Sequence, residues 1–74
     1  MIVSTTDTIP GQKIVKMIGA IEARCSHFVL NEAKSAQKNL EKKAEKLGAN
    51  AIVGFRLEKI SGVAHAYGTA VIVG

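Results

Sequence analysis

Hydrophobic positions along the first third of the chain recur with the period of strands. Residues 1–9 are rich in Val, Ile and Thr and end at Pro10-Gly11, a pair typical of a turn. In residues 13–23, apolar side chains occupy both alternating sets of positions, as in a strand that is covered on both faces. We expect a helix to cover one of these faces and a neighbouring subunit the other. Gly19, within this segment, indicates a bulge or a close backbone approach.

The segment 26–47 changes to a helical period. Its apolar positions are three or four residues apart and line one face of a helix: Val29, Ala33, Ala36, Leu40, Ala44 and Leu47. Ser26 fits the N-cap, and Gly48 stands where a glycine commonly ends a helix. The pattern therefore predicts one long helix with a buried apolar face.

After the helix, residues 51–60 and 63–73 flank Ser61-Gly62 and predict an antiparallel hairpin in which Ile60 faces Val63. In this register Phe55 lies opposite Gly68. One face of the hairpin is apolar and is assigned to the helix: Val53, Phe55, Leu57, Ala66, Gly68, Ala70 and Ile72. The other face is mixed: Ile52, Arg56, Glu58, His65, Tyr67 and Thr69. A slip of one residue would exchange the two sets.

The predicted order of strand, strand, helix, strand, strand defines an α+β fold with one long helix packed on an antiparallel sheet. We expect the 74 residues to form a single domain, 1–74. A chain of this size buries only about 60% of the surface that it exposes when unfolded. Because 47% of its residues are hydrophobic, we expect further burial through homo-oligomerisation.

The single cysteine excludes a disulfide framework within one chain and fits a cytoplasmic protein. We expect no signal peptide, and no apolar run is long enough to span a membrane. The net charge is +4, and Lys34, Lys38, Lys42 and Lys46 form one stripe on the predicted helix. We interpret this lysine stripe as a solvated face. Nucleic-acid binding is not favoured, because the three aromatic residues are not interleaved with the lysines.

Three segments, in the same order along the chain, match a known family. They are Ile2 to Gly11 (IVSTTDTIPG), Leu47 to Ala51 (LGANA) and Ala66 to Val71 (AYGTAV). Together they resemble the YbjQ-like family of heavy-metal-binding domains. Typical members carry an additional helical stretch between the second strand and the final helix, so this chain resembles a shortened member. The resemblance implies a dodecin-like fold, a ring-shaped homopentamer and binding of a heavy metal.

Cys25 and His27 form a Cys-x-His pair near the start of the predicted helix. Thiolate and imidazole suit soft or borderline ions such as copper(I) and zinc, and selenium in a reduced form is a further candidate ligand. Two ligands fall short of the four that a structural zinc requires, so a site needs several copies of Cys25 in a ring. The alternative is that Cys25 is a small packed hydrophobic residue.

Further polar residues offer weaker candidates for a site. His65 is expected opposite Glu58, which would favour the imidazolium, although such cross-strand pairs are commonly structural. Arg56 opposite Tyr67 predicts a cation–π contact. Asp7 lies among threonines and offers oxygen ligands, or belongs to a hydroxyl-rich strand end. These residues do not form a nucleophile, base and orienting group, so we expect no enzymatic activity.

Two functions remain open. The first is a small cytoplasmic ring that captures a soft heavy metal or a selenium species through Cys25. The second is a non-catalytic homo-oligomeric module that binds no metal and presents the lysine stripe or the central channel of the ring to a protein or acidic partner. Both functions require the chain to form a homo-oligomer.

Overall fold

The computed structural model describes residues 1–24, 32–60 and 62–74, and its elements follow the predicted order. They are β1 (Ile2–Val3), β2 (Ile14–Arg24), α1 (Glu32–Lys46), β3 (Ala51–Ile60) and β4 (Val63–Val73). The predicted α+β class is confirmed. Strand β1 is much shorter than the predicted segment 1–9, because the chain turns after Val3. In the described part of the chain, no helix has the length and apolar character needed to cross a membrane.

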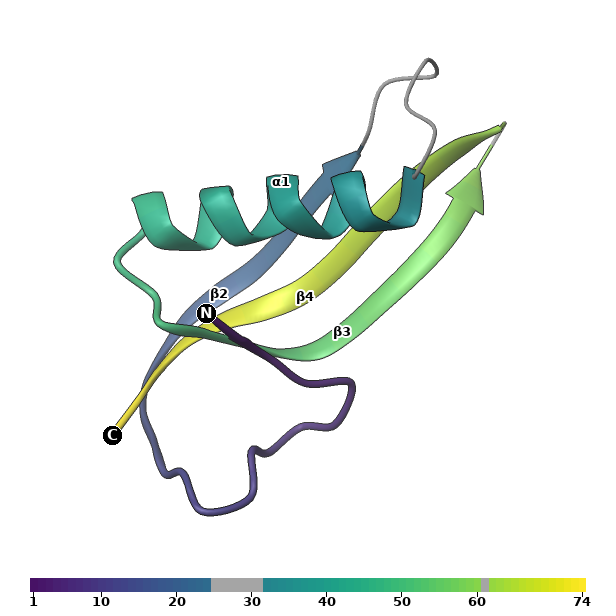
Figure 1. Cartoon of the computed structure of the whole chain (residues 1–74). Helices are drawn as coiled ribbons and strands as arrows, with labels where there is room; N and C mark the ends of the chain where they lie inside the picture. The colour runs from purple at the N-terminus through teal and green to yellow at the C-terminus, as the bar shows by residue number, and fades with distance from the viewer. Residues whose placement is uncertain (25–31, 61) are drawn as a thin grey trace.

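The strands form one mixed sheet in the order β1-β3-β4-β2. The three long strands run antiparallel to their neighbours, as predicted, whereas β1 pairs in parallel with β3. Helix α1 lies across one face of this sheet, and the loop that follows β1 lies on the other (Figure 1). Strand β2 therefore forms an edge of the sheet, beside the helix.

The helix packs on the sheet through small side chains. Ala36, Leu40 and Ala44 are fully buried, and they contact a cluster that includes Phe55 and Ala66. Three of the predicted helix-face positions are thus confirmed. Val29 lies outside the described residues, as does the predicted N-cap Ser26. Two alanines on the buried face allow the helix backbone to approach the sheet closely.

The end of α1 is a Schellman motif, with Gly48 in the left-handed conformation at φ +87°. The Gly48 N–H donates to the carbonyl of Glu45, and the Ala49 N–H donates to that of Ala44, each at 3.0 Å. The prediction for Gly48 is confirmed. The prediction that Leu47 is buried is wrong: its exposed fraction is 51%. The chain reverses at Gly48, so Ala49 reaches the core instead.

Strand β2 contains the bulge that Gly19 predicts, since its pairing with β4 shifts by one residue between Met17 and Gly19. On the helix side, Ile18 and Ile21 pack against the core. Val15 and Met17 remain 68% and 64% exposed, respectively. The helix thus covers one face of β2, and the cover expected from a neighbouring subunit stays a prediction.

The hairpin register is correct at the turn and wrong beyond a second bulge. Ile60 faces Val63, as predicted, but the register shifts by one residue between Val53 and Arg56, where Gly54 has φ +63°. Consequently Ile52 packs under the helix, and Val53 lies on the opposite face. The sequence assignment of these two residues was therefore inverted.

The loop after β1 accounts for this bulge. The backbone carbonyls of Thr6 and Ser4 accept hydrogen bonds from the N–H groups of Gly54 and Phe55, both at 2.9 Å. From the same loop, Ile9 covers a second apolar cluster that contains Val53, and this cluster also includes Ala51, Val71 and Val73. The loop thus fixes the bulge and closes one half of the face opposite α1.

Candidate functional site

The other half of the face opposite α1 carries six polar residues in two rows across three strands. One row runs Glu22, Tyr67, Arg56, and the next runs Arg24, His65, Glu58, in each case across β2, β4 and β3. We call these six residues the polar face. Charges of opposite sign alternate on this face. Each row has a glutamate at one end and an arginine at the other, and the order is reversed between the two rows. Glu22, Arg24, Arg56 and Glu58 are exposed.

His65 is largely enclosed within the polar face, with 13% of its side chain exposed. Its Nδ1 atom is buried and has no hydrogen-bond partner among the described residues. The Glu22 Oε1 atom lies 3.8 Å from this nitrogen, close enough for charge attraction but beyond hydrogen-bond distance. A buried imidazole nitrogen beside a carboxylate is a group that a proton or a metal ion would satisfy.

The predicted pairing of His65 with Glu58 is confirmed as a ladder position. However, the carboxylate that the structure brings near the imidazole is that of Glu22 on β2. Sequence reasoning missed Glu22, because it did not pair residues 13–23 with residues 63–73. The alternation of side chains along β2 indicates only which face of the strand carries Glu22. That His65 is its neighbour follows from the register of β2 with β4.

Tyr67 stacks on His65, with ring centroids 6.2 Å apart and planes inclined by 14°. Burial raises the pKa of the Tyr67 phenol above its ordinary value of 10.0, and the carboxylates of Glu22 and Glu58 raise it further. Arg56 lies opposite Tyr67, as predicted. The aromatic contact in the described structure is with His65, so the predicted cation–π contact with Arg56 stays a prediction.

The predicted metal ligands Cys25 and His27 lie outside the described residues. Arg24, which precedes Cys25 in the sequence, is opposite His65. Within residues 1–24, 32–60 and 62–74, no three His, Cys, Asp or Glu side chains are grouped closely enough to hold a metal ion. The described residues therefore form no complete metal centre by themselves.

The loop around Asp7 follows the second of its two interpretations. The hydroxyl groups of Ser4 and Thr6 bond to each other at 2.8 Å, and the Thr6 hydroxyl donates to the Thr8 carbonyl at 2.6 Å. The hydroxyl groups that flank Asp7 thus stabilise the turn after β1, while Asp7 itself is exposed.

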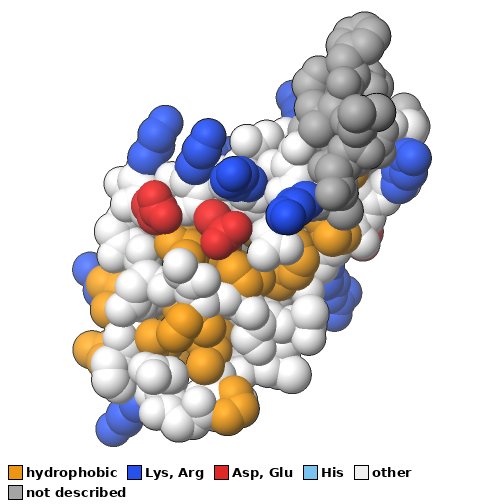
Figure 2. Space-filling view, in the orientation of Figure 1, with side chains coloured by type: hydrophobic (Ala, Val, Ile, Leu, Met, Phe, Trp, Pro, Cys, Tyr) orange, Lys and Arg blue, Asp and Glu red, His pale blue; other side chains and the backbone are white. Residues whose placement is uncertain are grey.

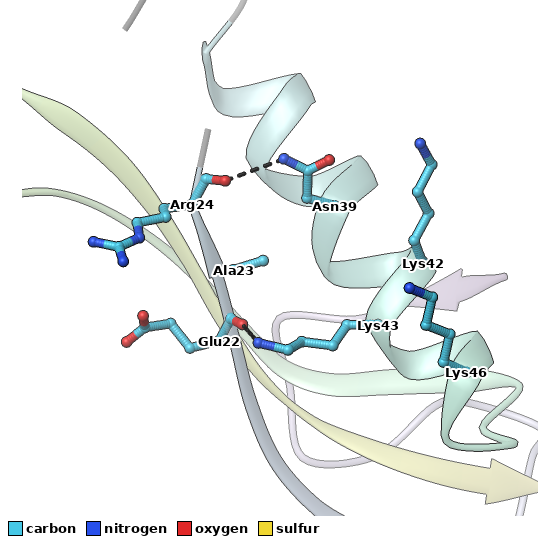
Figure 3. A pocket seen from close by; sticks show the side chains of 7 residues that line it. All are labelled: Glu22, Ala23, Arg24, Asn39, Lys42, Lys43 and Lys46. Atoms are coloured by element: carbon cyan, nitrogen blue, oxygen red, sulfur yellow. Dashed lines mark hydrogen bonds between the residues drawn. The ribbon is translucent and has the colours of Figure 1, made fainter. Parts of the chain in front are cut away.

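A second surface feature was not predicted from the sequence. A groove of about 540 Å³ separates α1 from the edge strand β2. Its walls include Asn39, Lys42, Lys43 and Lys46 on the helix (Figure 3). The four-residue spacing of the lysines was visible in the sequence, but the edge position of β2, which creates the groove, was not.

Fold and surface define a small α+β domain with an open polar face and a basic groove. The family described as "Putative heavy-metal-binding" (YbjQ) matches residues 26–74. A UPF0145 protein of Bacillus licheniformis is 31% identical, and the match covers all of both chains. A UPF0145 protein of Methanocaldococcus jannaschii is 38% identical over 99% of this chain and 92% of its own. The chain belongs to this family.

Two further comparisons bear on length and fold. The match to the Bacillus licheniformis protein spans 103 positions, whereas this chain has 74 residues; at least 29 positions of that match are therefore gaps in this chain. A crystal structure of a protein of unknown function from the DUF74 family of Pediococcus pentosaceus has a TM-score of 0.59. That protein is 22% identical in sequence, and the match covers all of this chain and 98% of the other. The likeness supports the fold.

Proposed function

We propose that this protein is a non-catalytic, cytoplasmic binding protein that captures a soft heavy metal or a reduced selenium species through Cys25, with His27 as a second ligand. The observation that carries the proposal is the match of residues 26–74 to a family described as "Putative heavy-metal-binding". Cysteine thiolate is the softest ligand that a protein side chain offers, and Cys25 is the single cysteine of this chain.

The polar face supports the proposal through the chemistry that it adds at one end of the sheet. Arg24, the residue before Cys25, is opposite His65, whose Nδ1 atom has no hydrogen-bond partner in the described part of the chain. The carboxylate of Glu22 lies 3.8 Å from that nitrogen. Imidazole and carboxylate are ligands for borderline ions such as zinc. His65 with Glu22, and Glu58 across the ladder from His65, are thus candidate supporting groups.

We further propose that the protein acts as a ring of five copies. One chain offers too few soft ligands to close a site, and a ring would bring five copies of Cys25 together. Val15 and Met17 are largely exposed on the edge strand β2, as expected of apolar side chains that another copy covers. The small core of a 74-residue chain also favours burial between copies.

Native mass spectrometry of the untagged protein tests the assembly and the ligand together. Wild type, Cys25→Ser and His27→Asn would be measured with zinc, copper(I), cadmium, and selenite with thiol. A ring that gains ligand mass in wild type, loses it in Cys25→Ser and keeps its copy number supports the proposal. A ring that gains no mass with any of these ligands contradicts metal and selenium capture but leaves the ring intact.

The second candidate function is an interaction module without metal. The lysines of α1 are exposed, and Figure 2 shows Lys and Arg side chains grouped on this side of the molecule. Reversal of Lys34, Lys38 and Lys42 should then abolish capture of an acidic partner while the ring persists. Retention of the partner by this triple variant would contradict the module.

A further inference from the structure

The groove between α1 and β2 is built by two hydrogen bonds that cross it. The Lys43 ammonium donates to the Glu22 carbonyl at 2.8 Å, and the Asn39 amide donates to the Arg24 carbonyl at 3.1 Å (Figure 3). Both carbonyls point outward from the edge of the sheet. The two bonds therefore tie the helix to the edge strand and set the width of the groove.

The same two bonds limit what the groove can bind. An extended peptide that adds to a sheet edge needs the outward carbonyls as acceptors. In this stretch of β2, helix side chains already occupy the carbonyls of Glu22 and Arg24. The part of the groove that can still bind a ligand is therefore its helix side, which carries the lysine ammonium groups.

Three ammonium groups face this groove, from Lys42, Lys43 and Lys46. Lys42 and Lys46 form no ion pair with any described residue, and Lys43 uses one of its three N–H donors on the Glu22 carbonyl. Among the described residues of the lining, Glu22 alone carries a carboxylate. Figure 3 shows this carboxylate on the far side of β2 from the lysines, and it lies near His65 instead.

The C-terminal end of α1 repels an anion less than the C-terminus of a helix usually does. Lys46 is the last residue of α1, where free carbonyl groups give a helix partial negative charge. Here the carbonyls of Ala44 and Glu45 accept hydrogen bonds from Ala49 and Gly48. The lysines thus remain the main source of charge in the groove.

We propose that this groove binds the diphosphate group of a small molecule. Lys42 and Lys46 are one helical turn apart, so their ammonium groups, which form no ion pair with a described residue, lie on one side of the helix. Lys43 and Asn39 supply further donors. Lysine is a common ligand of phosphate groups. The groove volume of about 540 Å³ falls within the range of small-ligand sites. The described residues that line it include no aromatic side chain, so they offer a nucleic acid no stacking surface.

Isothermal titration calorimetry with inorganic pyrophosphate and with ADP tests this proposal. The protein is freed of metal ions with a chelator, because both probes bind metals. Lys42→Glu/Lys46→Glu removes the ammonium groups of these two lysines from the groove. Lys34→Glu/Lys38→Glu makes the same charge change on the same helix, at residues that do not line the groove. Circular dichroism of both variants checks that α1 remains folded.

We expect pyrophosphate and ADP to bind wild type with similar affinity, since the phosphates supply the contacts. The dissociation constant should rise at least about tenfold in Lys42→Glu/Lys46→Glu, as charge-assisted contacts are lost, and change less than about twofold in Lys34→Glu/Lys38→Glu. Equal weakening in both variants would show a diffuse charge effect and overturn the site. Absence of binding to wild type, or preference for a single-stranded oligonucleotide over pyrophosphate, would also overturn it.

Discussion

Gly68 of β4 lies directly under Ile52 of β3. A Cβ atom placed on Gly68 would come within 2.5 Å of the Ile52 Cγ2 atom and 3.7 Å of the Leu40 Cδ2 atom. Ile52 and Leu40 are both fully buried. The missing side chain at Gly68 therefore makes room for the residue that the bulge at Gly54 turns under the helix.

Gly68→Ala should lower the free energy of unfolding by about 1–3 kcal/mol, the usual cost of overpacking a filled core. The Ile52 methyl group cannot move away freely, because its surroundings are packed. Urea unfolding measures the change. In an Ile52→Ala background the same substitution should cost less, since its clashing atom is gone. Equal cost in both backgrounds would show that the Gly68–Ile52 contact is not the cause.

Leu40→Ala should destabilise the protein by about 2–5 kcal/mol, because Leu40 is fully buried in the centre of the helix face. Leu47→Ala is the matched control: it removes the same atoms from a side chain that is 51% exposed. It should change the free energy of unfolding by less than about 0.5 kcal/mol. Similar losses in both variants would mean that Leu47 is buried after all, as the helical period alone suggests.

Gly48→Ala should weaken the end of α1 by about 1–2 kcal/mol, because a side chain at φ +87° is strained. Gly48→Asn should cost less, since asparagine tolerates the left-handed conformation. Thermal unfolding followed by circular dichroism compares the two variants. The Schellman motif assigned to this end would be contradicted if Asn were as costly as Ala.

Predictions from the sequence succeeded where neighbours along the chain decide the structure. The period of Ala36, Leu40 and Ala44, the stop at Gly48 and the turn before Val63 are all local signals, and each is confirmed. They failed for Ile52 and Val53. There the deciding hydrogen bonds come from the loop after β1, more than forty residues earlier in the chain.

The candidate site shows the same division. Alternation along the hairpin placed Glu58 opposite His65, because both strands share one turn. Glu22 belongs to a strand that reaches β4 only through the tertiary fold, so nothing near it in the sequence indicates His65 as its neighbour. The groove has the same origin, since it exists only because β2 is an edge strand beside α1.

Stability at alkaline pH should depend on Tyr67. Its pKa is raised above 10.0 in the folded protein by burial and by the carboxylates of Glu22 and Glu58, so near that pH the folded state holds the phenolic proton more strongly than the unfolded state. The unfolded state then binds fewer protons, and the free energy of unfolding must fall as pH rises. The stabilisation is present in full below pH 10.0 and is lost as pH rises through the folded-state pKa.

Tyr67→Phe isolates this contribution, because it removes the phenolic proton and leaves every other ionisable side chain unchanged. Urea midpoints of wild type and Tyr67→Phe would be measured from neutral pH to about pH 11, across the ordinary phenol pKa. We expect the wild-type midpoint to decline more steeply than that of the variant above pH 10.0. Glu22→Gln should reduce the difference, because it removes one of the two carboxylates that oppose the phenolate. Parallel declines in wild type and Tyr67→Phe would show that the phenol has the same pKa in the folded and unfolded states.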